Sequence, residues 1–126
     1  MRLLLTLIFL SLTGSAWSID CAKAITTPEA NECGRIEQKK VEEKLNQIYQ
    51  RILKDLEKPD TETEKFTEMK STLVNAQRVW VKFREADCHA VYVRNQSGTI
   101  RGIAFISCMQ QRAEDRIKQL EFYEHE

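Results

Sequence analysis

Residues 41–56 read Val-Glu-Glu-Lys-Leu-Asn-Gln-Ile-Tyr-Gln-Arg-Ile-Leu-Lys-Asp-Leu, and this stretch decides the class of fold. Its apolar residues recur at intervals of three and four, with two more apolar residues beside them. They are Val41, Leu45, Ile48, Ile52 and Leu56, flanked by Tyr49 and Leu53. This spacing places the apolar side chains along one face of an α-helix. Such a helix buries that face against partner helices, so the pattern predicts an all-α protein.

The ends of this first helix are marked by local signals. Thr27, Pro28 and Glu29 combine an N-cap candidate, a proline at the first helical position and an acid in the first turn. We expect the helix to end at Pro59, because proline cannot continue the ladder of hydrogen bonds. Thr61, with Glu64 three residues later, resembles a capping box and predicts the start of the second helix.

Two further apolar stripes follow, separated by a turn cluster at residues 95–99. The second stripe contains Phe66, Met69, Leu73, Ala76 and Trp80, with Val91 further along. The third contains Ile103, Ile106, Met109 or Gln110, Ala113, Ile117 and Leu120. The chain has only 2 prolines and 4 glycines, which argues against a β-sandwich. We therefore expect three long helices in an antiparallel bundle or hairpin arrangement.

The N-terminus has the pattern of a cleavable signal peptide. Arg2 precedes an apolar run at residues 3–12, and the small residues Ala16 and Ser18 follow it. An uncleaved membrane anchor is the alternative, but the run is shorter than the roughly 20 apolar residues that a spanning helix needs. We expect residues 1–18 to be removed, leaving residues 19–126 as a single domain without a membrane anchor, in the periplasm or secreted.

All four cysteines, Cys21, Cys33, Cys88 and Cys108, lie beyond the predicted cleavage point. An even number of cysteines in an exported chain is typical of disulfides, and four cysteines allow three pairings. We favour Cys21–Cys33 and Cys88–Cys108, because each closes a short loop. Lipidation of Cys21 is the alternative for this residue, and the charged Asp20 before it argues against that.

The composition and motifs exclude several classes of function. The 19 basic and 19 acidic residues balance, so we expect no nucleic-acid partner. The chain has no nucleophile elbow or phosphate-binding loop, and Ser97 before Gly98 is typical of a turn. It also has no CxxC pair, and His89 and His125 lack ligand spacing with any cysteine. We therefore expect no metal, no cofactor and no catalysis.

One set of polar residues lies on the second helix, where a simple bundle would bury apolar ones. Gln77, Trp80, Arg84, Asp87 and Cys88 share roughly one side of that helix. We expect Arg84 to lie on the Trp80 indole and Asp87 to pair with Arg84, while Gln77 bonds to the first helix. This polar ladder either fixes the register of the helices or forms part of a partner-binding surface. The first interpretation is favoured, since buried polar groups are usually hydrogen-bonded within the core.

Several of these residues together resemble the family of the lysozyme inhibitor LprI-like N-terminal domain. The resemblance rests on short motifs along nearly the whole chain after residue 18. They are Asp20-Cys21-Ala22-Lys23-Ala24, Asn31-Glu32-Cys33, Leu45-Asn46 with Tyr49, the block Ala76-Gln77-Arg78-Val79-Trp80-Val81-Lys82-Phe83-Arg84-Glu85-Ala86-Asp87-Cys88, and Cys108 with Arg112. The resemblance implies a helical, disulfide-stabilised bacterial envelope protein that binds and blocks a lysozyme-type muramidase.

A muramidase inhibitor needs a projecting element that fits a cleft containing two carboxylates. The segment 94–101 suits this role, because it is polar and has a basic residue at each end. Its candidate contact residues are Arg94, Asn95, Gln96, Ser97 and Arg101. A plain connection between helices is the alternative interpretation of this segment, and the one that we favour, because most loops only connect elements. For the whole protein, the alternative to a lysozyme inhibitor is a structural or adaptor module that binds another envelope protein.

Overall fold

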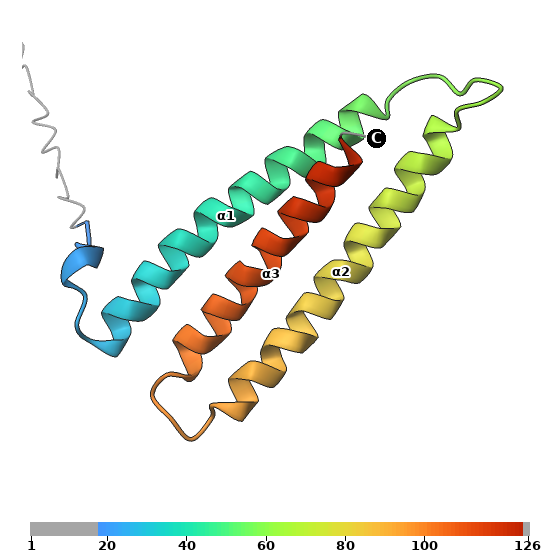
Figure 1. Ribbon diagram of the computed structural model, residues 1–126. Coiled ribbons are helices and arrows are strands. Elements are labelled where there is room, and N and C mark those ends of the chain that lie inside the picture. The colour runs from blue at the N-terminus through green and yellow to red at the C-terminus, as the bar shows by residue number, and fades with distance from the viewer. Residues whose placement is uncertain (1–17, 125–126) are drawn as a thin grey trace, which may run out of the picture.

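The computed structural model describes residues 18–124, which form a short 3₁₀ turn and three helices (Figure 1). The elements are η1 (Cys21–Lys23), α1 (Thr27–Asp55), α2 (Phe66–Arg94) and α3 (Arg101–Tyr123). This confirms the predicted all-α class with three long helices. The proposed signal peptide, apart from Ser18, and His125 lie outside the described residues. None of the described helices is long and apolar enough to cross a bilayer.

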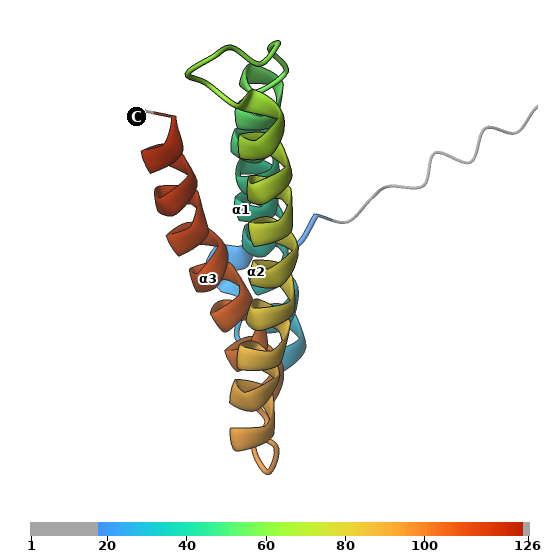
Figure 2. The ribbon, with the colours of Figure 1, turned by 90° about the vertical axis from the view of Figure 1, so that its right-hand side faces the viewer.

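The three helices are arranged with α3 packed along both α1 and α2 (Figures 1 and 2). Helices α2 and α3 form an antiparallel hairpin, whereas α1 and α3 run in the same direction (Figure 1). As a result, α1 and α3 both begin at the end of the bundle where the α2–α3 loop lies. This topology brings segments that are about 70 residues apart in sequence to one end of the molecule.

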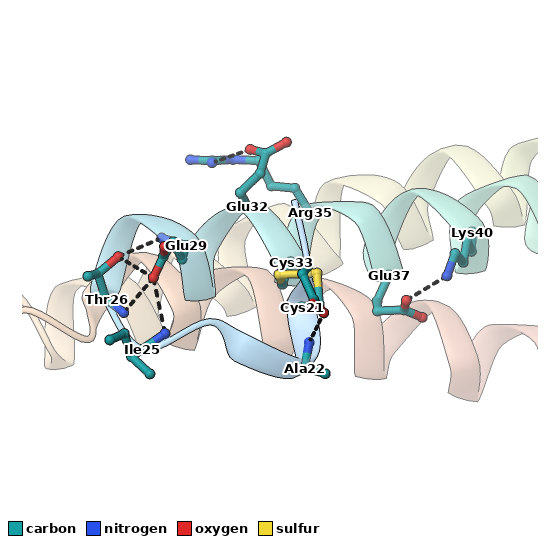
Figure 3. Close-up of a disulfide and its surroundings, with 11 residues drawn as sticks. Cys21, Ala22, Ile25, Thr26, Glu29, Glu32, Cys33, Arg35, Glu37 and Lys40 are labelled. Atoms are coloured by element: carbon teal, nitrogen blue, oxygen red, sulfur yellow. Dashed lines mark hydrogen bonds and ion pairs between the residues drawn. A yellow bond between two sulfur atoms is a disulfide. The ribbon is translucent and has the colours of Figure 1, made fainter. Parts of the chain in front are cut away.

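The start of α1 is capped one residue earlier than the sequence pattern predicts. Thr26, not Thr27, is the N-cap residue, and its hydroxyl accepts a hydrogen bond from the Glu29 backbone N–H at 3.3 Å. The Glu29 carboxylate in turn accepts the Thr26 backbone N–H at 2.9 Å, which completes a capping box (Figure 3). These bonds from Thr26, with a further one from the backbone of Ile25, lower the pKa of the Glu29 carboxyl.

The connection between α1 and α2 is longer than predicted at both ends. Helix α1 ends at Asp55, before Pro59, and α2 begins only at Phe66. Thr61 does accept a hydrogen bond from the Glu64 backbone N–H, but this pair shapes the loop and does not cap the helix. The nearby side chain that bonds to the first turn of α2 is Asp60, which accepts the Thr67 backbone N–H at 2.9 Å.

The core is built from members of the three predicted stripes, although Met69 and Ala76 of the second stripe are exposed. Its buried members come from α1 (Leu45, Ile48, Ile52), α2 (Leu73) and α3 (Ala113, Ile117, Leu120). Burial of these side chains removes apolar surface from water, which is the main force that holds the helices together. Towards the loop end, Gly34 permits a close approach of α1 to α3. A Cβ atom at this position would lie 2.7 Å from Cδ1 of Ile103.

Both predicted disulfides are confirmed. Cys21–Cys33 ties the N-terminal arm and η1 to α1 (Figure 3). Cys88–Cys108 joins α2 to α3 across their shared hairpin, and Cys88 is completely buried. The second bond lies close to the α2–α3 loop. It therefore fixes the distance between the end of α2 and the start of α3, which carry this loop.

Candidate partner-binding site

The polar ladder of α2 is centred on Trp80. The guanidinium carbon of Arg84 lies 4.6 Å from the centroid of the indole ring, as the spacing predicts. The guanidinium of Arg116, from α3, lies 5.9 Å from the same ring. Cation–π contacts of this kind contribute about 0.5–2 kcal/mol, with the larger values at desolvated sites. Both arginines are only 8% exposed, so these cations belong to the interior of the bundle and not to its surface.

The polar partners of the ladder differ from those that the sequence predicts. Asp87 does not pair with Arg84; its carboxylate accepts a hydrogen bond from Nε of Arg112 on α3 at 2.7 Å. Arg84 instead donates to Glu42 of α1. The disulfide explains this arrangement, because Asp87 precedes Cys88 and Arg112 lies one turn after Cys108. The covalent bond thus places these two charged side chains opposite each other.

Gln77 also bonds to a different helix from the one predicted. Its side-chain oxygen accepts from Nε of Arg116 on α3 at 3.0 Å, not from a group on α1. Burial lowers the pKa of the Arg116 guanidinium, since the charged form loses hydration there. Its Nη1 also donates to Gln119. Since the contacts of the ladder connect α2 to α1 and α3, they support the interpretation that the ladder fixes the register of the helices.

The α2–α3 loop has a different character, because it projects from the end of the bundle. Arg94 is the last residue of α2 and Arg101 the first of α3, so the loop itself comprises residues 95–100. The Asn95 side-chain amide donates to the carbonyl of Val91 at 2.8 Å, and Arg101 donates to the carbonyl of Gln96 at 3.2 Å. Arg94 and Arg101 are both exposed. The loop is therefore compact and has a cation at each end.

A hollow of about 620 Å³ lies beside this loop. Its walls come from the first turns of α1, the end of α2, loop residues 97–99 and the start of α3. Two arginines line it, Arg35 and Arg101, and its lining residues include no acidic side chain. Asn31 also lines it, and the side-chain oxygen of this residue is buried without a hydrogen-bond partner.

Comparison with known protein families identifies the family of the chain. The family model of lysozyme inhibitor LprI matches residues 20–120. The chain belongs to the LprI family. The matched region contains both disulfides, the polar ladder and the α2–α3 loop. Searches among curated proteins and among solved structures find no match to this LprI-family chain.

Sequence reasoning assigned no site role to four residues of this LprI-family structure, namely Arg35, Glu42, Arg116 and Asn31, although Asn31 belongs to one of the motifs of the resemblance. Arg116 had a detectable signal, because it directly precedes Ile117 in the third apolar stripe and follows Arg112 by one turn. Glu42 looks like any solvated acid of α1, and Asn31 like any polar residue near the start of a helix. Their roles depend on which side chains face them from other helices, which local spacing does not encode.

The Glu42–Arg84 pair provides a test of the ladder. Replacing Glu42 with glutamine leaves the Arg84 guanidinium without its carboxylate in a mostly dry setting. We expect the free energy of unfolding to fall by about 1–2 kcal/mol, below the loss for a fully buried pair, because the Glu42 side chain is 33% exposed. Urea denaturation followed by circular dichroism measures this change.

The matched control is Glu43→Gln, which removes the same charge from an exposed neighbouring position of α1. Its free energy of unfolding should stay within about 0.5 kcal/mol of the unmodified protein. Equal losses for the two variants would show that the net charge of α1, and not the contact with Arg84, determines the effect.

Proposed function

We propose that this LprI-family protein binds a lysozyme-type muramidase and blocks its cleft with the α2–α3 loop. The observation that carries the proposal is the position of this loop. It lies at the end of a rigid hairpin, with a basic residue on each side and no acidic residue between Arg94 and Arg101. A muramidase cleft contains two carboxylic acid groups, so a cationic insert complements its charge.

The hairpin also meets the mechanical requirement for an inhibitor. A loop that is already ordered before binding loses less conformational entropy when it enters a cleft. The Cys88–Cys108 disulfide crosslinks α2 and α3 below the loop, and the hydrogen bonds of Asn95 and Arg101 hold its two ends. These features support a preformed insert rather than a flexible tail.

We further propose that the protein acts in the periplasm or after secretion, as a binding protein rather than an enzyme. Two disulfides are typical of oxidising compartments outside the cytoplasm. The apolar run at residues 3–12 and the small residues after it support export by a cleaved signal peptide. Membership of a family named for a lysozyme inhibitor supports a protein partner.

The test of this proposal is residual muramidase activity in the presence of a molar excess of the purified protein. Lysozymes of the c, g and i types are the candidate targets. We expect inhibition of at least one of them, and we expect Arg94→Ala and Arg101→Ala each to raise the required concentration about tenfold, as for other interface arginines. Inhibition of none of the three types would reject the proposal.

Arg78→Ala is the matched control for the loop variants. Arg78 is an exposed arginine of α2 that lies more than four turns before the loop, so its replacement removes the same charge at a distance. Its potency should equal that of the unmodified protein. If Arg78→Ala and Arg94→Ala weaken inhibition equally, general charge attraction and not loop insertion explains the binding.

A second candidate function, an adaptor that binds another envelope protein, is favoured by one observation. Val79 and Phe83 lie four residues apart on α2 and are 59% and 58% exposed. Exposed apolar side chains that lie together on one helix face often mark protein-binding surfaces. Crosslinking in the native envelope distinguishes the candidates: a muramidase recovered through the loop supports the first, and a different protein recovered through Phe83 supports the second.

A further inference from the structure

We propose that the hollow beside the α2–α3 loop binds an acidic side chain, presented on a peptide segment of the protein partner. This inference rests on the proposed function and extends it, because it adds a receiving site to the inserting loop. The hollow lies between the loop and α1, because Ser97, Gly98 and Thr99 form one of its walls and α1 supplies another. It exists only because α1 and α3 start at the same end of the bundle (Figure 1).

The charge of the hollow specifies the sign of its ligand. Arg35 and Arg101 enter it from two different helices, and its lining residues include no acid to neutralise them. Arg35 does pair with Glu32 at 3.2 Å, but both side chains are more than half exposed, and exposed pairs of this kind are weak. A guanidinium has five N–H donors, so each arginine keeps donors for a carboxylate.

The start of α3 adds to this positive character. Helix N-termini carry partial positive charge and N–H groups that need acceptors. The capping box of Thr26 and Glu29 fulfils this need for α1, whereas the N-cap residue of α3, Ile100, provides no side-chain acceptor. Ser97 and Thr99, both hydroxyl-bearing residues, also line the hollow.

The size of the hollow indicates that the ligand is more than a simple anion. Its volume of about 620 Å³ exceeds the space that a single carboxylate fills, and it lies within the range of small-ligand sites. Because the proposed function supplies a protein partner, the carboxylate is one that a peptide segment carries.

The position of Asn31 is fixed by its contact with α3. A Cβ atom at Gly102 would lie 3.0 Å from Nδ2 of Asn31, so the amide packs directly against the glycine backbone. Asn31 is therefore held in place by the helix contact and does not need a ligand to order it. This wall of the hollow is thus ordered before the partner arrives.

The experiment uses isotope-labelled protein and three probes in an NMR titration. The probes are N-acetyl-aspartate methylamide, its neutral counterpart N-acetyl-asparagine methylamide, and acetate. We expect saturable shifts of the Gly98, Thr99 and Gly102 amide signals with the aspartate probe, at least tenfold weaker binding of acetate, and no saturable shifts with the asparagine probe. Equal binding of the aspartate and asparagine probes, or shifts located elsewhere, would overturn the inference.

Two variants assign the binding to named groups. Arg35→Gln and Arg101→Gln should each weaken binding of the aspartate probe about tenfold, because each removes one cation from the lining of the hollow. Arg78→Ala, remote from the hollow, is the control and should bind like the unmodified protein. Acetate binding as tightly as the aspartate probe would show an anion site only and would reject the peptide ligand.

Muramidase assays separate this inference from the proposed function. If no muramidase is inhibited but the aspartate probe binds in the hollow, the proposed function fails and the acidic-peptide site stands. If a muramidase is inhibited with equal potency by the unmodified protein and by Arg35→Gln, and the probe does not bind, the proposed function stands and the inference fails.

Discussion

Replacing Leu120 with alanine should lower the free energy of unfolding by about 3–5 kcal/mol, near the upper end for leucine-to-alanine changes. Leu120 is completely buried, and it belongs to the cluster in which side chains from all three helices meet. The smaller side chain would leave a cavity among helices that the rest of the core holds apart. The corresponding decrease in melting temperature is about 10–20 °C for a domain of this size, measured by circular dichroism.

Phe122→Ala is the control for this change. Phe122 lies two residues further along α3, it is larger than leucine, and it is 60% exposed. Its removal should change the free energy of unfolding by less than about 1 kcal/mol. If the phenylalanine change costs as much as the leucine change, the end of α3 is packed differently from the arrangement in Figure 1.

The class of fold was predictable because many residues repeat the same signal. Leu45, Ile48 and Ile52 satisfy the helical spacing, and all three are buried in the core. An error at any one position would not have changed the predicted face. The disulfide pairing was predictable for a similar reason, since short loops limit the pairs that a hairpin can bring together.

Helix ends were less predictable, because each depends on one or two competing local interactions. Thr26 and Thr27 are both suitable caps, and only the hydrogen bonds of Glu29 select the first. Similarly, Asp60 bonds to the first turn of α2 from seven residues before Thr67, which is outside the usual capping pattern. Local motifs therefore located the helices to within a few residues.

The candidate site was predictable only in part. Its loop is made of residues that are adjacent in sequence, whereas its other contacts join residues from different helices. The turn residues 95–99 predict a loop with basic residues at its ends, and the structure has that loop. The hollow beside it requires Arg35 of α1 to lie near Arg101 of α3, which follows only from the parallel course of these two helices. The Asp87–Arg112 pair likewise depends on how α2 and α3 are rotated relative to each other.

Removing the Cys88–Cys108 disulfide should lower the free energy of unfolding by about 3 kcal/mol. The bond closes a loop with a sequence separation of 20, which restricts the unfolded chain more than it restricts the folded hairpin. We would use the double variant Cys88→Ala and Cys108→Ala, because serine would place a hydroxyl group at the fully buried position 88. Thermal and urea denaturation measure the loss.

The matched control removes the other disulfide through Cys21→Ala and Cys33→Ala. Its sequence separation of 12 gives a similar restriction of the unfolded chain. However, the Cys21 arm is mostly exposed and packs mainly against α1, so the folded protein also regains freedom there when the bond is absent. We therefore expect a smaller loss of stability, about 1 kcal/mol. A larger loss than for the Cys88–Cys108 pair would contradict this assignment of the arm as peripheral.

The two disulfide variants should also differ in muramidase inhibition, measured well below their melting temperatures. Without the Cys88–Cys108 bond, the ends of α2 and α3 are held at the loop by side-chain contacts such as Asp87–Arg112. The loop at residues 95–100 then has more conformations, so entering a cleft costs more entropy, and potency should fall about tenfold. The Cys21–Cys33 variant leaves this hairpin crosslinked and should keep its potency. Equal potency of both variants would mean that the rigidity of the hairpin does not contribute to binding.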